Sequence, residues 1–137
     1  MRTAYIDAVL SVAALIPAGH VLSYGDIAVL LESGGPRQVG SVLARYGSDV
    51  PWWRVIRAGG LPPQGHDERA LAQYLSEGTA LRGKTTGEDA SWRVDMRTAR
   101  WNPDDAQLAA LDAVREDMAR QEAPDVDLSV PRDGLEP

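Results

Sequence analysis

The stretch SYGDIAVLLESGGPRQVGSVLARY, residues 23–46, decides the fold. Its first letters, S-Y-G-D, match the capping box that starts a helix, and Gly34 with Gly35 ends that short helix. Pro36 suits the first turn of a second helix, which we expect to end at Gly47. Two helices joined by a tight glycine turn at this spacing predict a helix-turn-helix.

The second of these helices has two distinct faces. Its apolar face predicts core positions at Val39, Val42, Leu43 and Tyr46. The opposite face is small, polar and basic, with Arg37, Ser41 and Arg45 at spacings of four. Gly40 lies inside the helix, where glycine costs about 1 kcal/mol relative to alanine, so another group is expected to approach the backbone there. The alternative is an ordinary surface helix, because a helix-turn-helix pattern alone is weak evidence.

Further helices are expected on both sides of this motif. Helical spacing of apolar residues predicts an amphipathic helix over residues 3–16 and another within residues 66–78. The inward positions of the latter are predicted to be Leu71, Tyr74 and Leu75.

Short extended segments are expected between these helices. Arg54 to Arg57 fits a strand, Gly59-Gly60 a turn, and Leu61 the beginning of the return strand, which together favour a short β-hairpin. Residues 83–91 are typical of a polar loop, and residues 91–101 of a short strand or extended segment.

The last quarter of the chain has a different composition. Residues 102–137 carry 3 basic and 10 acidic residues, against 11 and 10 in residues 1–101. A helix-start signal predicts a helix over about 103–121, followed by a disordered, acidic and proline-rich tail. The apolar stripe of this helix comprises Leu108, Leu111, Val114 and Met118, and fits either folding back onto the body or binding a partner helix. We therefore divide the chain into a body, 1–101, and an acidic extension, 102–137.

Composition excludes several classes of function. The chain has no cysteine, which excludes a disulfide framework, a cysteine-ligated zinc site and a thiol nucleophile. Its two histidines lie far apart, without a metal-binding pattern. No apolar run approaches the length of a membrane span, so we expect a cytoplasmic protein without a membrane partner. The net charge is −6, but the body is nearly neutral with local basic clusters, which is compatible with a DNA surface.

Two adjacent tryptophans stand in VPWWRVI, residues 50–56, of a chain without phenylalanine. Taken alone, Trp52 and Trp53 are most simply core residues, because aromatic side chains dominate core burial. Adjacent residues of an extended segment point in opposite directions, however, so one ring could line a pocket while the other packs in the core.

The segments SYGDIA, PRQVGSVLA and VPWWRVI, in this order, resemble the DNA-binding domain of the O6-alkylguanine-DNA alkyltransferase family. The resemblance covers roughly residues 3–101. In those enzymes a P-C-H-R-V motif holds the alkyl-accepting cysteine, whereas this chain has PWWRV. Tryptophan at the cysteine position marks the alkyltransferase-like proteins. The implied fold is mainly α, a winged helix-turn-helix-like DNA-binding domain with a short β-hairpin, here followed by the C-terminal acidic helix and tail.

The resemblance also implies DNA-binding residues. Tyr24 matches the tyrosine that presses on the phosphate backbone and helps to turn the nucleotide out. Arg37 matches the arginine that fills the resulting gap in the base stack. The remaining DNA-binding positions along the minor groove are expected to be Gln38, Gly40, Ser41 and Arg45.

A pocket for the turned-out base is expected around the tryptophan motif. Its predicted residues are Tyr24, Pro51, Trp52, Trp53, Arg54 and Val55, with Trp52 in place of the cysteine and Arg54 mainly structural. Some relatives have an arginine that touches the base, and here only Arg57 or Arg69 could substitute. Glu77 matches the glutamate of a Cys-His-Glu relay, but with both partners replaced it is expected to be an ordinary charged residue near a helix end.

These observations favour non-enzymatic recognition of O6-alkylguanine in duplex DNA. Alkyl transfer needs a soft, activated nucleophile, and this sequence has none. The resemblance implies a monomer without cofactor or metal, associated with the nucleoid, that flags the lesion for nucleotide excision repair. One alternative is a helix-turn-helix regulator without lesion specificity, which would not depend on Trp52. Another is an enzyme, which would remove the alkyl group or form a covalent adduct.

Overall fold

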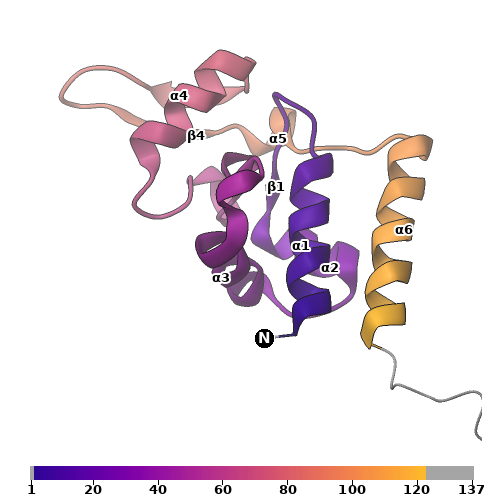
Figure 1. The fold of residues 1–137 in the computed structure, drawn as a ribbon. Coiled ribbons are helices and arrows are strands. Elements are labelled where there is room, and N and C mark those ends of the chain that lie inside the picture. The colour runs from indigo at the N-terminus through magenta and orange to yellow at the C-terminus, as the bar shows by residue number, and fades with distance from the viewer. Residues whose placement is uncertain (1, 123–137) are drawn as a thin grey trace, which may run out of the picture.

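The computed structural model describes residues 2–122 and is mainly helical (Figure 1). Its elements are α1 (Thr3–Leu15), β1 (Leu22–Ser23), α2 (Tyr24–Leu31), α3 (Pro36–Tyr46), β2 (Val55–Ile56), α4 (Asp67–Glu77), β3 (Leu81–Lys84), β4 (Ser91–Val94), α5 (Met96–Ala99) and α6 (Asp105–Glu122). Three one-turn 3-10 helices complete the fold: η1 (Gly47–Asp49), η2 (Trp52–Arg54) and η3 (Ala58–Gly60). The predicted acidic tail lies outside the described residues. Within residues 2–122, no helix is both long and apolar enough to cross a membrane.

The predicted helix-turn-helix is confirmed in α2 and α3, which pack against each other. The capping box forms as expected: Ser23 Oγ accepts from the Asp26 N–H at 3.0 Å, and Asp26 Oδ2 accepts from the Ser23 N–H at 2.9 Å. Gly34 adopts φ +71°, and an added Cβ would lie 2.3 Å from the Tyr5 hydroxyl. The turn between the helices therefore requires glycine at this position.

The main core lies between α1, α2 and α3. Its fully buried side chains include Val9, Val12, Ile16, Ile27, Val39 and Val42. The prediction that Tyr46 of α3 is a core residue is wrong, because its side chain is 46% exposed. It is the last residue of the helix, beyond the core, and its ring instead lies 5.8 Å from the Arg45 guanidinium.

The strands form two separate pairs. β2 confirms the strand expected near Arg54–Arg57, but it pairs in parallel with β1 and has no return strand at Leu61. Gly59 and Gly60, at φ +84° and +89°, instead form part of the short helix η3. The short β-hairpin is formed by β3 and β4, so the polar loop expected to begin at residue 83 starts within a strand.

Two further expectations in this part of the chain need correction. Tyr74 of α4 is fully buried, as predicted. The prediction that Leu75 faces inward is wrong, because its side chain is 59% exposed. The segment 91–101 is not extended throughout, since it contains α5. Asp95 begins that helix by accepting a hydrogen bond from the Arg97 N–H through Oδ1 at 3.2 Å.

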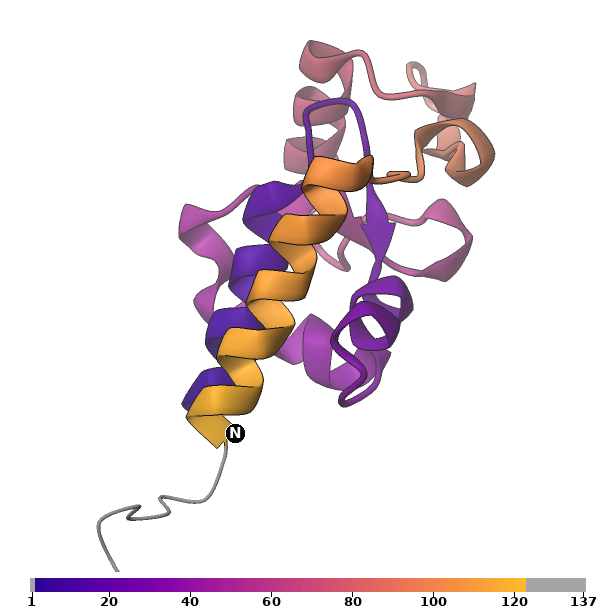
Figure 2. The ribbon, with the colours of Figure 1, turned by 90° about the vertical axis from the view of Figure 1, so that its right-hand side faces the viewer.

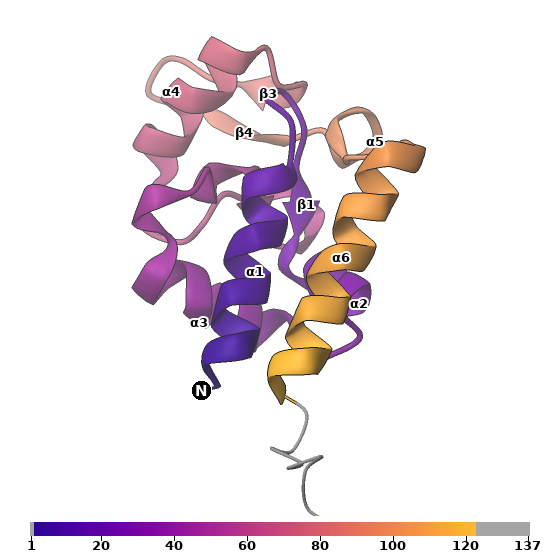
Figure 3. The same ribbon diagram turned by 45° about the vertical axis from the view of Figure 1, so that its right-hand side comes forward.

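The predicted C-terminal helix is present as α6 and folds back onto the body. It packs lengthwise along α1 (Figure 2), and its Leu111 and Met118 join the main core. Leu108 is 44% exposed and does not belong to the buried stripe. Arg115 pairs with Glu32 after α2 at 3.0 Å. Figure 3 shows α1 between α3 and α6, so the acidic helix covers the side of α1 turned away from α3.

Candidate nucleic-acid interface

The second helix of the helix-turn-helix, α3, presents a polar face to solvent. Arg37, Gln38 and Arg45 are exposed, while Gly40 and Ser41 are half-buried. Gln38 is partly engaged, because its Oε1 accepts a hydrogen bond from the Gly35 N–H at 3.0 Å and so caps the helix. Among residues 2–122, no carboxylate pairs with Arg37 or Arg45. Both guanidinium groups are therefore available to an external anion.

A cavity of about 360 Å³ borders the same helix. Its lining residues come from α2, α3, η1, η2, the segments between β2 and α4, and the first turn of α4: Tyr24, Gly40, Leu43, Ala44, Gly47, Ser48, Trp52, Arg57, Pro63, Gln64, His66 and Arg69. The lining contains two arginines and no carboxylate. Such a volume is at the lower end of the range for pockets that take small molecules, about 300–1,000 Å³.

The Tyr24 ring is the group that approaches the helix backbone at Gly40. An added Cβ on Gly40 would lie 3.5 Å from Tyr24 Cδ2, which is ordinary contact. Burial raises the pKa of the Tyr24 hydroxyl, and the positive charge of Arg57 opposes this only in part. The hydroxyl therefore remains a hydrogen-bond donor at neutral pH.

Trp52 forms an aromatic wall of the cavity with polar groups around it. The Arg69 guanidinium lies 5.1 Å from the Trp52 ring centroid, and the His66 ring 5.4 Å away at a tilt of 56°. The sequence offered Arg57 and Arg69 without a position for either, and the fold brings both to the cavity. His66 was expected to be a structural or solvent-facing residue and not part of the cavity, because no local pattern distinguishes it from an ordinary loop histidine.

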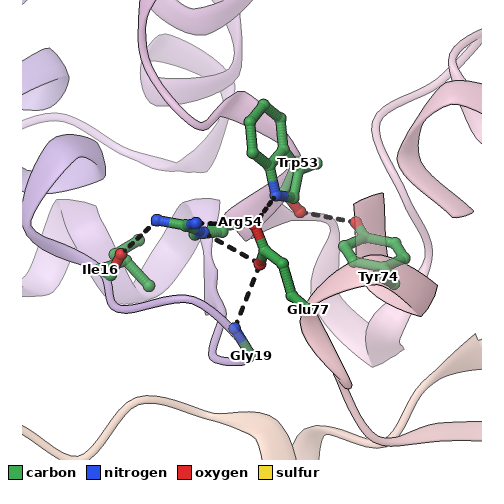
Figure 4. Close-up of polar contacts among 6 residues, drawn as sticks. All are labelled: Ile16, Gly19, Trp53, Arg54, Tyr74 and Glu77. Carbon is green, nitrogen blue, oxygen red and sulfur yellow. Dashed lines mark hydrogen bonds and ion pairs between the residues drawn. The ribbon is translucent and has the colours of Figure 1, made fainter. Parts of the chain in front are cut away.

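The other residues predicted for the pocket lie outside the cavity lining. Val55 is fully buried in β2, and Pro51 precedes the tryptophan turn. Trp53 and Arg54 are directed toward Glu77 at the end of α4 (Figure 4). The tryptophans are not in an extended segment as expected: η2 holds their rings edge to face, with centroids 5.6 Å apart.

Glu77 is the centre of a buried hydrogen-bond network (Figure 4). Its Oε2 accepts from Trp53 Nε1 at 2.9 Å and from Arg54 Nη2 at 2.6 Å, and its Oε1 accepts from Arg54 Nε at 3.1 Å. The backbone N–H of Gly19 also donates to Oε1, at 3.1 Å. Arg54 Nη1 continues the network to the Ile16 carbonyl at 2.8 Å. The network therefore links α4, η2 and the loop after α1.

This network corrects the expectation that Glu77 is an ordinary charged residue near a helix end. Its side chain is only 10% exposed. Burial acts to raise the pKa of the carboxyl group, but the hydrogen bonds from Arg54, Gly19 and Trp53 outweigh it and hold the pKa below its ordinary value. Glu77 is thus a charged acceptor, and the Trp53 N–H occupies one of its lone pairs.

Comparisons with known proteins identify the family of the chain. The DNA-binding domain of the 6-O-methylguanine DNA methyltransferase family matches residues 4–79. The DNA base-flipping protein of Escherichia coli (strain K12) is 40% identical over 98 residues, which cover 66% of this chain and 69% of that protein. The protein of the same name from Shigella flexneri matches to the same extent.

Two solved structures share the fold. One is S. pombe Atl1 in complex with damaged DNA containing O6-carboxymethylguanine, with a TM-score of 0.62 and 24% identity. The other is S. pombe ATL in complex with DNA, with a TM-score of 0.62 and 25% identity. Each match covers 75% of this chain and 100% of the S. pombe chain. The chain belongs to the family of the 6-O-methylguanine DNA methyltransferase DNA-binding domain, as an alkyltransferase-like member.

Proposed function

We propose that this protein binds duplex DNA and holds an O6-alkylated guanine, turned out of the helix, in the cavity beside α3. The observation that carries the proposal is the cavity itself, which has Trp52 as an aromatic wall and borders the exposed basic face of α3. The similar proteins named for base flipping, and the S. pombe relative bound to damaged DNA, support it. In this arrangement Tyr24 and Arg37 turn the nucleotide out and fill its place.

Energetics favour a damaged base over a normal one in such a cavity. Turning a base out of the duplex costs a few kcal/mol, and less where damage weakens its pairing. Stacking on an aromatic ring contributes about 1–3 kcal/mol. An alkyl group adds about 0.8 kcal/mol for each buried CH₂. The cavity beside Trp52 would therefore bind an alkylated guanine more tightly than an unmodified guanine, which stays firmly paired in the helix.

We propose that binding is not followed by alkyl transfer. The sequence has no cysteine, and the histidine that would activate one is replaced by Trp53. The Trp53 N–H donates to Glu77 and cannot accept a proton from a nucleophile. The glutamate of the enzymatic relay thus has a structural partner in this chain.

The remaining parts of the proposed function rest on the family resemblance. They are action as a monomer in the cytoplasm, in association with the nucleoid, and transfer of the marked site to nucleotide excision repair.

The test is binding by fluorescence anisotropy at one fixed salt concentration, because phosphate contacts make affinity salt-dependent. One labelled duplex carries a single O6-methylguanine and a second, otherwise identical duplex carries guanine. Tighter binding to the damaged duplex, with the adduct intact afterwards, is the expected result. Equal binding to both duplexes would instead indicate a helix-turn-helix regulator, and loss of the alkyl group would indicate an enzyme.

A further inference from the structure

The β3–β4 hairpin has a basic outer face that the proposed function does not use. Side chains alternate across a strand, so every second residue of the hairpin faces the same way. On the inner face, Trp92 meets the Tyr74 ring edge-on with centroids 5.9 Å apart, and Val94 is almost fully buried. The outer face consists of Arg82, Lys84, Ser91 and Arg93, all exposed.

Two of these residues form an unfavourable pair. The register places Arg82 directly opposite Arg93, and like charges in that arrangement destabilise a hairpin. Within residues 2–122 neither arginine forms an ion pair. The carboxylate of Asp89, in the loop of the hairpin, pairs instead with Lys84 at 2.8 Å. Arg93 makes only an exposed hydrogen bond of 3.4 Å, from Nη1 to the Gly59 carbonyl. An external anion would relieve this repulsion.

The hairpin contacts the turn that follows the cavity residue Arg57. Gly59, which Arg93 contacts, follows the cavity residue Arg57 by two positions. Gly60 packs so closely on β4 that an added Cβ would lie 2.2 Å from the Val94 carbonyl oxygen. The hairpin is therefore fixed against the turn that leads out of the cavity. In Figure 1, β4 and α3 lie on the side of α1 away from α6.

We propose that Arg82 and Arg93 bind the phosphate backbone of the duplex that flanks the turned-out base. The proposal rests on the proposed function for its partner, duplex DNA, but concerns a separate surface. Duplex DNA carries one negative charge for about every 1.7 Å of its axis, so adjacent phosphates can accept two neighbouring guanidinium groups. Arg37 and Arg45 of α3 then hold the duplex on one side of the cavity and the hairpin holds it on the other.

The test compares Arg82→Gln with the wild-type protein on the damaged and the undamaged duplex over a series of salt concentrations. Arg93→Gln is a second variant, and Arg120→Gln is the matched control, because it removes one exposed charge from α6. Arg82→Gln is expected to lower the affinity for both duplexes by the same several-fold factor. It should also reduce the steepness of the plot of log K against log salt concentration by about 1. The melting temperature of the free protein should stay the same or rise, since a repulsion is removed.

Two outcomes would overturn the proposal. One is an affinity and salt slope for Arg82→Gln that equal those of Arg120→Gln. The other is a loss confined to the damaged duplex, which would make Arg82 part of lesion recognition instead of a backbone contact. The salt slope on the undamaged duplex remains informative even if the protein shows no preference for the lesion, so this test and that of the proposed function can fail separately.

Discussion

The two sides of the tryptophan turn, η2, differ in how completely the protein satisfies its own polar groups. On one side, Glu77 accepts four hydrogen bonds from Trp53, Arg54 and Gly19, and its side chain is only 10% exposed. On the other side, Trp52 borders a cavity that holds two arginines and no carboxylate. On the first side the polar groups are satisfied by residues of the chain itself, whereas the second side offers positive charge and aromatic surface to a ligand. Adjacent residues thus separate the support of the site from the site itself.

The largest expected effect comes from removing the centre of the supporting side. Glu77→Ala leaves the largely buried Arg54 guanidinium with only its hydrogen bond to the Ile16 carbonyl. Breaking such an ion pair by removing one partner typically costs about 3–5 kcal/mol of unfolding free energy. Urea denaturation measures this loss. Glu77→Gln is an intermediate variant, because it removes the charge and keeps one accepting oxygen, while its amide NH2 cannot accept the hydrogen bonds made to the other oxygen. A variant Glu77→Ala as stable as the wild type would show that the network is not a support.

The next effect concerns the cavity side. Trp52→Ala is expected to lower affinity for an O6-methylguanine duplex by about ten-fold or more, because a stacked base contributes about 1–3 kcal/mol. Affinity for the undamaged duplex should change much less. Fluorescence anisotropy on both duplexes measures the ratio. An unchanged ratio would remove Trp52 from lesion recognition and favour the regulator.

A smaller effect is expected from Trp53→Phe, which keeps an aromatic ring but removes the N–H that donates to Glu77. The loss of this hydrogen bond and of ring volume should cost about 1–2 kcal/mol of stability. The preference for the damaged duplex should largely remain, since Trp53 does not line the cavity. If this variant reduced the preference as much as Trp52→Ala, the division between the two sides would be wrong.

The smallest effect is a dependence of stability on acid. The pKa of Glu77 is lower in the folded protein than its ordinary value of 4.5. Its contribution is therefore fully present above about pH 4.5 and is lost as the pH falls through the lower, folded-state pKa. Urea denaturation between about pH 3 and pH 7 should show a smaller loss of stability in acid for Glu77→Gln than for the wild type. Identical profiles would contradict the lowered pKa.

The helix-turn-helix could be predicted because its signals are local. The capping box at Ser23, the glycine turn and Pro36 each act within a few residues, and the helical period then assigns the buried face. The same period placed Tyr46, Leu75 and Leu108 inward, although the side chains of all three are largely exposed. Periodicity gives the direction of a side chain and cannot show where its packing partners end.

The cavity and its support could be predicted only in part. Trp52 and Tyr24 came from the family motif, but Arg57 after β2, His66 before α4 and Arg69 in α4 meet at the cavity only through the path of the chain between them, which no residue pattern specifies. The hydrogen bonds of Glu77 join three segments that are far apart in the sequence. Such a network depends on tertiary packing, so the motif alone suggested that this carboxylate had lost its partners.

The position of α6 gives the molecule an electric dipole. This helix carries five acidic and two basic residues, and α1 separates it from the arginines of α3. We therefore expect a polyanion to repel α6 and attract α3 before contact. The protein can approach DNA in a productive orientation despite its overall charge of −6. Added salt should slow this oriented encounter, because screening at about 0.15 M limits the field to about 8 Å.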